Sequence, residues 1–418
     1  MALFFIINIL LFITITVYKP YYLTKYFHYS FINPITIMFV VSLPVIIFTV
    51  FFGPLIALDE SLFDPYYQYA LYVTNISIFL ELLVMIFLLK YLKKKPSVLN
   101  LVNRIRHFTL KRNRMTIIGI IFLFLFIISF VLLTKDTLGV IGWISKPRVG
   151  YQFHREGKGH FFAACISFLS LSYVFSTFAI KRNSTLIFTS FFFIILIFFM
   201  GSKGFVLQFT IYFIILLWLR KYRHFKLIIM LCIPFVFGFM LLNFFSSAQF
   251  DFEAIFRYFD YYANSAMYYK AYLNGKIELF LGKIFITSFW GLIPRALYPD
   301  KPFVYGFLYV NEIFYPGAAE ASHTPAFGGP IGIFADFGLL GVIIFSIINI
   351  KVIVETILYF LLYKNLNINT IRSNSNLLYL FVWLLSPALF SFILFPMNLF
   401  LFLIIILFIS FTARIKLI

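Results

Sequence analysis

The sequence predicts an all-α polytopic integral membrane protein with about 11 transmembrane helices, in a range of about 10 to 12. Of its 418 residues, 62% are hydrophobic and 12% are charged, and the mean hydropathy is +0.98. Soluble domains have about a quarter of their residues charged, so this composition excludes a soluble fold. Apolar runs recur along the chain, and basic residues gather between some of them. Because the unit of such a fold is the spanning helix, we expect one transmembrane domain over residues 1–418.

The expected spans are runs of about 20 apolar residues, the length that crosses the hydrocarbon core. The first run lacks a basic leader and a small-residue cleavage site, so we interpret it as a retained span. Cys165 and Cys232 lie inside apolar runs, and nothing indicates a disulfide. The runs are residues 2–18, 34–56, 70–89, 115–134, 160–180, 184–200, 204–219, 227–246, 330–358, 376–395 and 397–413.

The net charge of +19 is concentrated in two segments between spans. Nine of the 34 basic residues lie in residues 90–114, and four more lie in RKYRHFK at 220–226. Cytoplasmic loops carry such an excess of Lys and Arg. We therefore interpret the charge as a signal of orientation and lipid contact, rather than as a nucleic-acid surface.

Alternating the spans from the basic segment 90–114 assigns every other loop to one side of the membrane. Both basic segments then lie in the cytoplasm, as does the C-terminal RIK. The outer segments are ALDESLFDPYYQ at 57–68, residues 135–159, the GSKG turn at 201–204 and residues 247–327. Residues 135–159 and 247–327 are the two longest of these segments and the ones that carry the candidate motifs.

The long outer segment 247–327 is predicted to contain interfacial amphipathic helices. FDFEAIFRYFDYYANSAMYYKAYLNG, at 250–275, has aromatic residues at helical spacing and ends in Asn-Gly, which is typical of a helix with a C-terminal cap. Its tyrosines suit the headgroup layer of a membrane. A second, half-apolar stretch at 277–290 leads into GLIPRALYPDKPFVYG at 291–306, which we call the hook.

The hook has a restricted backbone and two cations. Arg295 follows a proline and Lys301 precedes one, so neither is expected in the middle of a helix. A guanidinium held in this way suits a phosphate or diphosphate, which it can bind bidentately. The alternative is a structural staple, in which Arg295 or Lys301 pairs with Asp300 or a lipid headgroup.

A second polar stretch, RVGYQFHREGKGH at 148–160, lies in the outer segment 135–159. Gly159 follows Arg148 by eleven positions, as Gly306 follows Arg295, and no other arginine of the chain has this spacing to a glycine. The stretch is too polar for packing alone at a membrane face. Its basic side chains are Arg148, His154, Arg155, Lys158 and His160.

With these two stretches the sequence resembles the O-antigen polymerases of the Wzy type, a family of bacterial oligosaccharide repeat-unit polymerases. The family pattern is an Arg, ten residues and a Gly in each of two large periplasmic loops. RVGYQFHREGKG in residues 135–159 and RALYPDKPFVYG in residues 247–327 match it. The resemblance covers most of the chain as topology and implies a GT-C-like fold.

Two further stretches are similar to segments of this family. HTPAFGGPIGIFADFGLLG, at 323–341, resembles the entry of an outer loop into a late span in these polymerases and in O-antigen ligases, which implies a functional role for His323. The alternative is an interfacial His that caps a helix, with glycines for close packing. GSKG resembles a short basic turn, which would make Lys203 a phosphate contact rather than a snorkelling helix-end lysine.

The resemblance implies glycosyltransfer at the periplasmic face of the bacterial inner membrane. A growing glycan on undecaprenyl diphosphate would be the donor, and the non-reducing end of a new undecaprenyl-diphosphate-linked repeat unit the acceptor. Cations at the interface can stabilise the departing diphosphate, and a His can take the proton of the acceptor hydroxyl. The expected partners are membrane lipids, a Wzz-type chain-length regulator and a Wzx-type flippase.

The candidate site residues follow from these motifs. We expect catalytic roles for Arg148, Arg295 and His323, and substrate-binding roles for Arg155, Lys158, Lys203, Lys301, Gly159 and Gly306. The alternative bases are Asp59, Glu60, Asp64, Asp251 and Glu253. The outer loops have no Asp-x-Asp pair and the outer histidines are scattered, so we expect no metal and no other cofactor.

Two other functions remain open. An O-antigen ligase, which transfers glycan to the lipid A core, shares the topology and the outer cations, but the paired Arg-to-Gly spacing favours a polymerase. A lipid-linked oligosaccharide flippase should place charges within its spans. The predicted spans hold few charges, chiefly Glu81, Asp336, Lys351 and Glu355, which favours an enzyme with its site at one face.

Overall fold

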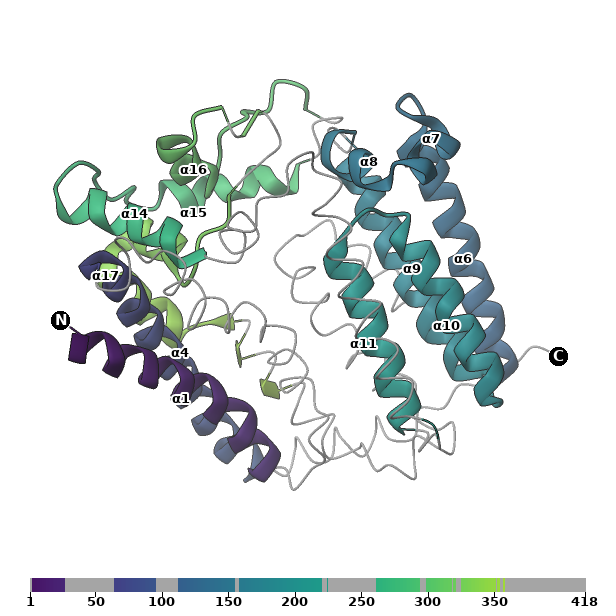
Figure 1. Cartoon of the computed structure of the whole chain (residues 1–418), viewed down its shortest axis with the longest axis horizontal. Helices are drawn as coiled ribbons and strands as arrows, with labels where there is room; N and C mark the ends of the chain where they lie inside the picture. Colours follow the sequence, from purple (N-terminus) through teal and green to yellow (C-terminus); the bar gives the residue numbers. More distant parts are fainter. Residues whose placement is uncertain are drawn as a thin grey trace. The chain divides into compact units, whose positions relative to one another are not determined.

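Helices form all the regular secondary structure of the residues that the structure describes. This computed structural model describes residues 2–26, 64–94, 112–154, 158–219, 224, 261–293, 298–317, 319–320, 325–350, 352–353 and 356–357. The helices labelled in Figure 1 are α1 (Ala2–Tyr26), α4 (Pro65–Lys93), α6 (Arg112–Thr134), α7 (Gly139–Ser145), α8 (Pro147–Phe153), α9 (Gly159–Ala179), α10 (Asn183–Phe198), α11 (Lys203–Leu219), α14 (Tyr261–Leu273), α15 (Lys283–Thr287), α16 (Leu308–Phe314) and α17 (Ile331–Ile347). A short 3-10 helix, η2 (Ser288–Leu292), follows α15.

Three helices are long and apolar enough to cross a membrane, at Pro65–Lys93, Asn113–Thr134 and Gly159–Thr177. Shorter apolar helices occupy four more of the predicted runs, in α1, α10, α11 and α17. These helices confirm the class of a helical membrane protein. The runs 34–56, 227–246, 376–395 and 397–413 lie outside the described residues, so the count of about 11 spans and the GT-C-like fold stay predictions.

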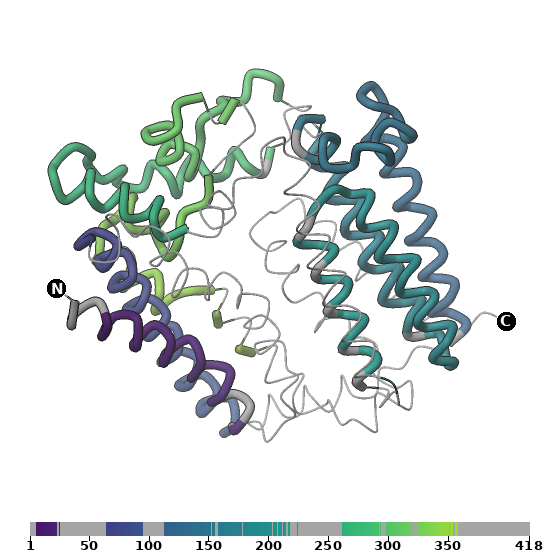
Figure 2. The backbone as a smooth tube through the Cα atoms, viewed as in Figure 1, coloured from purple at the N-terminus to yellow at the C-terminus, as the bar shows by residue number. Residues whose placement is uncertain are grey.

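The chain divides into two compact units, each built from three separate segments. The first unit comprises residues 1–95, 244–291 and 302–360, and the second comprises residues 96–243, 292–301 and 361–418. Because the segments interleave, the units are not consecutive domains of the sequence. The backbone of each unit can be followed by colour in Figure 2.

In the first unit, α4 packs against α1, α14 and α17. The carboxylate of Asp64 accepts a hydrogen bond from the Tyr66 N–H at 3.0 Å, and Pro65 occupies the first helical position. A side-chain cap followed by a proline is a strong helix start, so α4 begins five residues before the predicted apolar run at 70–89. Asp64 is therefore a helix cap in this structure.

The α14 helix ends where the Asn-Gly pair predicts. The Lys276 N–H donates to the Ala271 carbonyl and the Gly275 N–H to the Tyr272 carbonyl, with Gly275 at φ +69°, which is a Schellman motif. The expectation that the tyrosines of this helix lie among lipid headgroups is wrong for three of them. Tyr262, Tyr268 and Tyr269 are buried in the core of the first unit, against rings such as Phe12, Phe314 and Phe334. Aromatic rings bury large areas, and here protein rather than lipid covers them.

The α17 helix is broken at Gly338, which has φ +65° and ψ −162°. The break exposes backbone carbonyls that a continuous helix would use internally. The Ala335 and Asp336 carbonyls instead accept hydrogen bonds from the N–H groups of Phe280 and Leu281, both at 2.9 Å. The predicted span 330–358 is thus interrupted, and a loop segment completes its hydrogen bonding.

In the second unit, α6 and α9 form the most extensive helix pair, with α10 and α11 beside them (Figure 1). A Cβ at Gly119 would lie 2.5 Å from Ser176 Oγ, so this glycine lets the two backbones approach. Ser172 Oγ donates to the Gly119 carbonyl at 2.7 Å, and the rings of Phe122 and Phe175 stack. A small residue and a hydroxyl thus fix the crossing of the two longest helices that the structure describes in this unit.

Candidate functional site

The segment between α6 and α9, which carries the first Arg-to-Gly motif, is folded into the short helices α7 and α8. The fully buried Trp143 of α7 donates its indole N–H to the Phe199 carbonyl at 3.0 Å. A Cβ at Gly150 would lie 2.6 Å from the Trp143 ring, so α8 packs directly on the indole. Pro147 starts α8 with the φ that a first helical residue needs. These contacts fix α8 against the turn between α10 and α11.

Arg148 lies in the first turn of α8 and reaches that same turn. Its Nη1 donates to the Gly201 carbonyl at 3.3 Å, and its guanidinium carbon lies 5.2 Å from the centre of the Tyr151 ring. The structure therefore brings the arginine of the first motif to the GSKG turn. A guanidinium has five N–H donors, and the hydrogen bond to Gly201 uses one of them. The remaining donors give Arg148 the capacity to bind a phosphate bidentately.

Two polar atoms at the start of α9 are buried without a hydrogen-bond partner in the described part of the chain. They are Lys158 Nζ and His160 Nδ1. The rings of Tyr151 and Phe162 lie 5.4 Å apart and join α8 to the first turn of α9. A buried ammonium without an acceptor favours an anion, and the free N–H groups at a helix N-terminus favour one too. The half-buried Arg148 and the buried ammonium of Lys158 therefore place two cations on neighbouring helices.

The described part of the hook is tied down at both ends. Lys301 is 8% exposed, and its Nζ donates to the Ile293 carbonyl at 3.0 Å. The Gly306 N–H donates to Thr287 Oγ1 at 2.9 Å. Lys301 thus links residues 293 and 301 of the hook through a backbone carbonyl, and its contact with substrate stays a prediction.

The two motif glycines have different surroundings. Gly306 adopts φ +57°, and a Cβ there would lie 2.8 Å from Ser288 Oγ and 3.3 Å from Ser288 Cα. Gly159 has no positive φ and no atom within 4 Å of an added Cβ. Only the second motif therefore has a steric need for glycine.

Most of the other predicted site residues lie outside the described ranges. Lys203 begins α11, where the structure describes only its backbone. The residues that lie outside are Arg155, Arg295, His323, Asp59, Glu60, Asp251 and Glu253. Of the described ones, Arg148, Lys158, Gly159 and Lys301 belong to the second unit, and Asp64 and Gly306 to the first.

Buried tyrosine hydroxyls of α14 are poor candidates for the general base. Burial raises the pKa of Tyr262 to about 12, and it raises the pKa values of Tyr268 and Tyr269 well above the ordinary value. These groups stay protonated near neutral pH. They can donate hydrogen bonds but cannot accept a proton from an acceptor hydroxyl.

Sequence reasoning missed Trp143, Gly201 and Asp336 as residues that position the candidate site. Trp143 and Gly201 hold α8, and the Asp336 carboxylate accepts hydrogen bonds from the N–H groups of Ile284 and Phe285 at 2.9 and 2.6 Å. A lone Trp in a polar outer segment and a lone Asp in an apolar span were the available signals. Neither signal says which partner the side chain has.

The fold and the site define the class of this protein. It is a helical membrane protein with cationic side chains on adjoining short and long helices. Two known proteins are similar to the chain, the O-antigen polymerases of Salmonella typhimurium strain LT2 and of Salmonella typhi. Each is 29% identical over 204 residues, which cover 47% of this chain and 49% of the relative. The chain therefore spans about half the length of the curated relatives it matches. These relatives confirm the resemblance to Wzy-type O-antigen polymerases.

No family model matches the sequence. No solved structure matches it either.

Proposed function

We propose that this chain is an O-antigen polymerase, a glycosyltransferase with a polyprenyl-diphosphate-linked donor. It transfers the growing glycan from undecaprenyl diphosphate to the non-reducing end of a new undecaprenyl-diphosphate-linked repeat unit. The reaction takes place at the periplasmic face of the bacterial inner membrane. The observation that carries this proposal is the similarity to two O-antigen polymerases over 204 residues.

The proposed step replaces a glycosyl–diphosphate bond by a glycosidic bond. The acceptor hydroxyl oxygen attacks the anomeric carbon of the donor glycan, and the bond from that carbon to the diphosphate oxygen breaks. The lipid diphosphate leaves with the electron pair, and the hydroxyl proton goes to a base, for which we propose His323. Asp59, Glu60, Asp251 and Glu253 are the alternative bases, while the carboxylate of Asp64 is engaged as a helix cap.

Cationic side chains stabilise the charge that develops on the leaving group. Arg148 and Lys158 offer unused donors on α8 and at the start of α9. We propose that Arg295 of the hook joins them on one diphosphate. The proposal is supported by the residues on either side of Arg295, 292–293 and 298–301, which group with the unit that contains Arg148. Arg155 and Lys203 extend the same proposed site along the chain.

The proposed partners follow from the substrate. The chain receives lipid-linked repeat units that a Wzx-type flippase delivers, and a Wzz-type regulator sets the length of its product. Membrane lipids surround the apolar faces of its spans.

The test is the lipopolysaccharide ladder of a strain that lacks the gene. We expect a single repeat unit on the core, with the ladder restored by the wild-type gene. Bare core would instead indicate a ligase or a flippase. Arg148→Ala and Arg295→Ala should each fail to restore the ladder at normal membrane abundance, because one transition-state contact of this kind is worth about 2 to 4 kcal/mol, or roughly a hundredfold or more in rate.

A further inference from the structure

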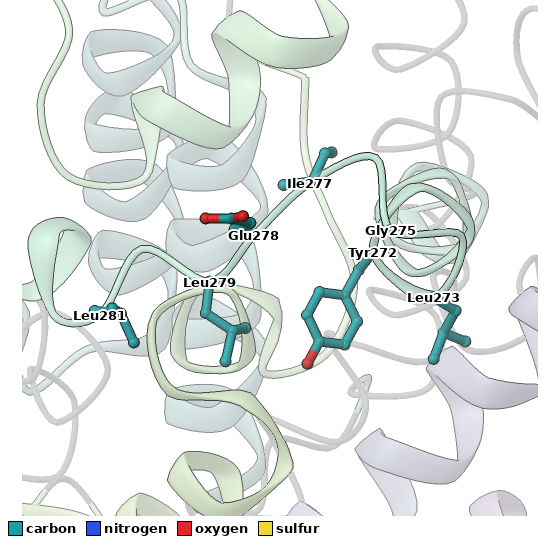
Figure 3. Close-up of a pocket in the computed structure, with 7 residues that line it drawn as sticks. All are labelled: Tyr272, Leu273, Gly275, Ile277, Glu278, Leu279 and Leu281. Carbon is teal, nitrogen blue, oxygen red and sulfur yellow. The ribbon is translucent and has the colours of Figure 1, made fainter.

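The first unit contains a pocket that none of the candidate site residues line. It lies where the C-terminal end of α14 leads into the loop before α15 (Figure 3). Its volume is about 530 Å³. The lining residues are Tyr272, Leu273, Gly275, Ile277, Glu278, Leu279 and Leu281.

The lining has the chemistry of a site for a neutral saccharide. It offers one aromatic ring, Tyr272, and one carboxylate, the exposed Glu278, among aliphatic side chains. An aromatic ring packs against the C–H face of a sugar, and a carboxylate accepts hydrogen bonds from its hydroxyls. Lys276 adjoins the lining in sequence, but no lysine or arginine is itself a lining residue, so the pocket wall offers a hydrogen-bond acceptor without a paired cation. The pocket and the cations of α8 and α9 therefore suit different parts of a lipid-linked oligosaccharide.

The pocket has a rigid frame at the break in α17. Leu279 packs against Gly338, where a Cβ would lie 3.3 Å from Leu279 Cδ1. The next two residues donate backbone hydrogen bonds to carbonyls freed by the break, and the Asp336 carboxylate accepts two more from the start of α15. Leu281 is held at φ +50°, a strained value for a residue with a side chain. A pocket held in this way needs little ordering when a ligand binds.

Interrupted helices in membrane proteins support binding sites because irregular backbone is tolerated where protein or a polar cavity surrounds it. The break at Gly338 gives the pocket its frame, because the carbonyls that it frees accept hydrogen bonds from the N–H groups of Phe280 and Leu281. The lining and this frame together favour a built site over an accidental hollow in the loop.

We propose that this pocket binds the neutral, non-reducing end of the acceptor oligosaccharide, with Glu278 accepting sugar hydroxyls and Tyr272 packing on a sugar ring. The identity of the sugar as an acceptor rests on the proposed polymerase function. The site itself rests on the pocket, its lining and its frame.

The experiment measures binding to the full chain in lipid nanodiscs. The probe is the phosphate-free repeat-unit oligosaccharide, released by mild acid from the lipid-linked units of the host cell. We expect the wild type to bind it, and we expect Glu278→Ala to weaken binding at least tenfold, with an intermediate loss for Glu278→Gln. Glu278 is exposed, so these variants should fold normally. Glu320→Ala is the matched control, because Glu320 is also exposed and does not line the pocket.

Competition separates this proposal from the diphosphate site. Inorganic pyrophosphate should leave oligosaccharide binding unchanged, and displacement by pyrophosphate would overturn the assignment to a neutral sugar. Absence of binding to the wild type, or equal binding by Glu278→Ala and wild type, would overturn the pocket as a saccharide site. The ladder assay judges the polymerase proposal separately, because a gene-deleted strain with a full ladder would defeat that function even if Glu278 binds the sugar.

Discussion

At the scale of single residues, the two Arg-to-Gly motifs share a spacing but differ in what the glycine does. Gly306 closes the hook against α15, through a backbone hydrogen bond to Thr287 and a contact with Ser288 that leaves no room for a Cβ. Gly159 only starts α9. Arg148 lies on a short helix that Trp143 fixes. The shared spacing therefore identifies both motifs, but a steric need explains the glycine only in the second motif.

We predict that Gly306→Ala is far more damaging than Gly159→Ala. A residue with a side chain pays about 1 to 2 kcal/mol in the left-handed region, and here the Cβ also meets Ser288. The lipopolysaccharide ladder of complemented strains and thermal unfolding in detergent measure the two variants side by side. We expect Gly306→Ala to shorten the ladder and unfold at lower temperature, while Gly159→Ala behaves as wild type. Equal behaviour of the two variants would contradict the steric role of Gly306.

We also predict that the Arg148→Lys variant loses most of the polymerase activity of the wild type. A lysine keeps the charge but cannot bind phosphate through a planar fork or stack its head group in the same way on Tyr151. The rate of polymerisation of purified lipid-linked repeat units should fall about tenfold or more, at unchanged membrane abundance. Arg182→Lys is the matched control, because Arg182 is an exposed arginine at the start of α10. A near-normal rate for Arg148→Lys would show that charge alone suffices.

At the scale of elements, hydrogen bonds between α17 and α15 join a predicted span to a predicted outer loop. Asp336 is 1% exposed in an apolar helix, and its two carboxylate oxygens accept the N–H groups of Ile284 and Phe285. A short helix such as α15 cannot satisfy its own first N–H groups, so the carboxylate of another helix caps it. The hook begins at residue 291, within η2, which directly follows α15, so this cap fixes the point from which the hook extends.

We predict that Asp336→Asn destabilises the start of α15 without leaving a cavity in the core. Asparagine keeps the volume but replaces one acceptor oxygen by an N–H₂ group, which leaves a backbone N–H unpaired at a cost of about 1 to 3 kcal/mol. Amide hydrogen exchange at residues 284–285 should accelerate roughly fivefold to a hundredfold, as read by mass spectrometry of the peptide that contains them. Ser346→Ala on the same helix removes the hydrogen bond to Ser77 and should leave this peptide unchanged. Unchanged exchange in Asp336→Asn would rule out the capping role.

The elements that sequence could predict are those with a strong local signal. The runs behind α4, α6 and α9 are apolar enough to demand a helix in a bilayer, and Asn274-Gly275 marks the end of α14. The break at Gly338 had no such signal, because a glycine in an apolar run also serves close helix packing. Its conformation depends on Phe280 and Leu281, which are distant in sequence and supply the missing hydrogen bonds.

At the scale of the whole molecule, composition predicts the membrane class and the position of charge predicts the orientation. The site is less accessible from sequence, because its geometry depends on long-range contacts such as that between Arg148 and Gly201. The interleaving of segments in the two units is also a long-range property, which apolar runs do not encode. The motif spacing predicted arginines that suit a diphosphate, while the partners of Arg148 came from the structure.

Orientation is the last prediction, since every proposed role of an outer residue depends on it. We expect Lys94 and Arg112 in the cytoplasm, and Arg148, Arg295 and His323 in the periplasm, because moving the basic segment 90–114 outward would oppose the positive-inside rule. Single cysteines at these positions, in a background without native cysteines, are treated with a membrane-impermeant thiol reagent. The three outer positions should label in cells whose outer membrane alone is permeable, and the two inner positions only after the inner membrane is opened. Labelling of position 295 only after that second step would place the hook on the cytoplasmic side, away from the proposed substrates, and would end the proposal of a periplasmic diphosphate site.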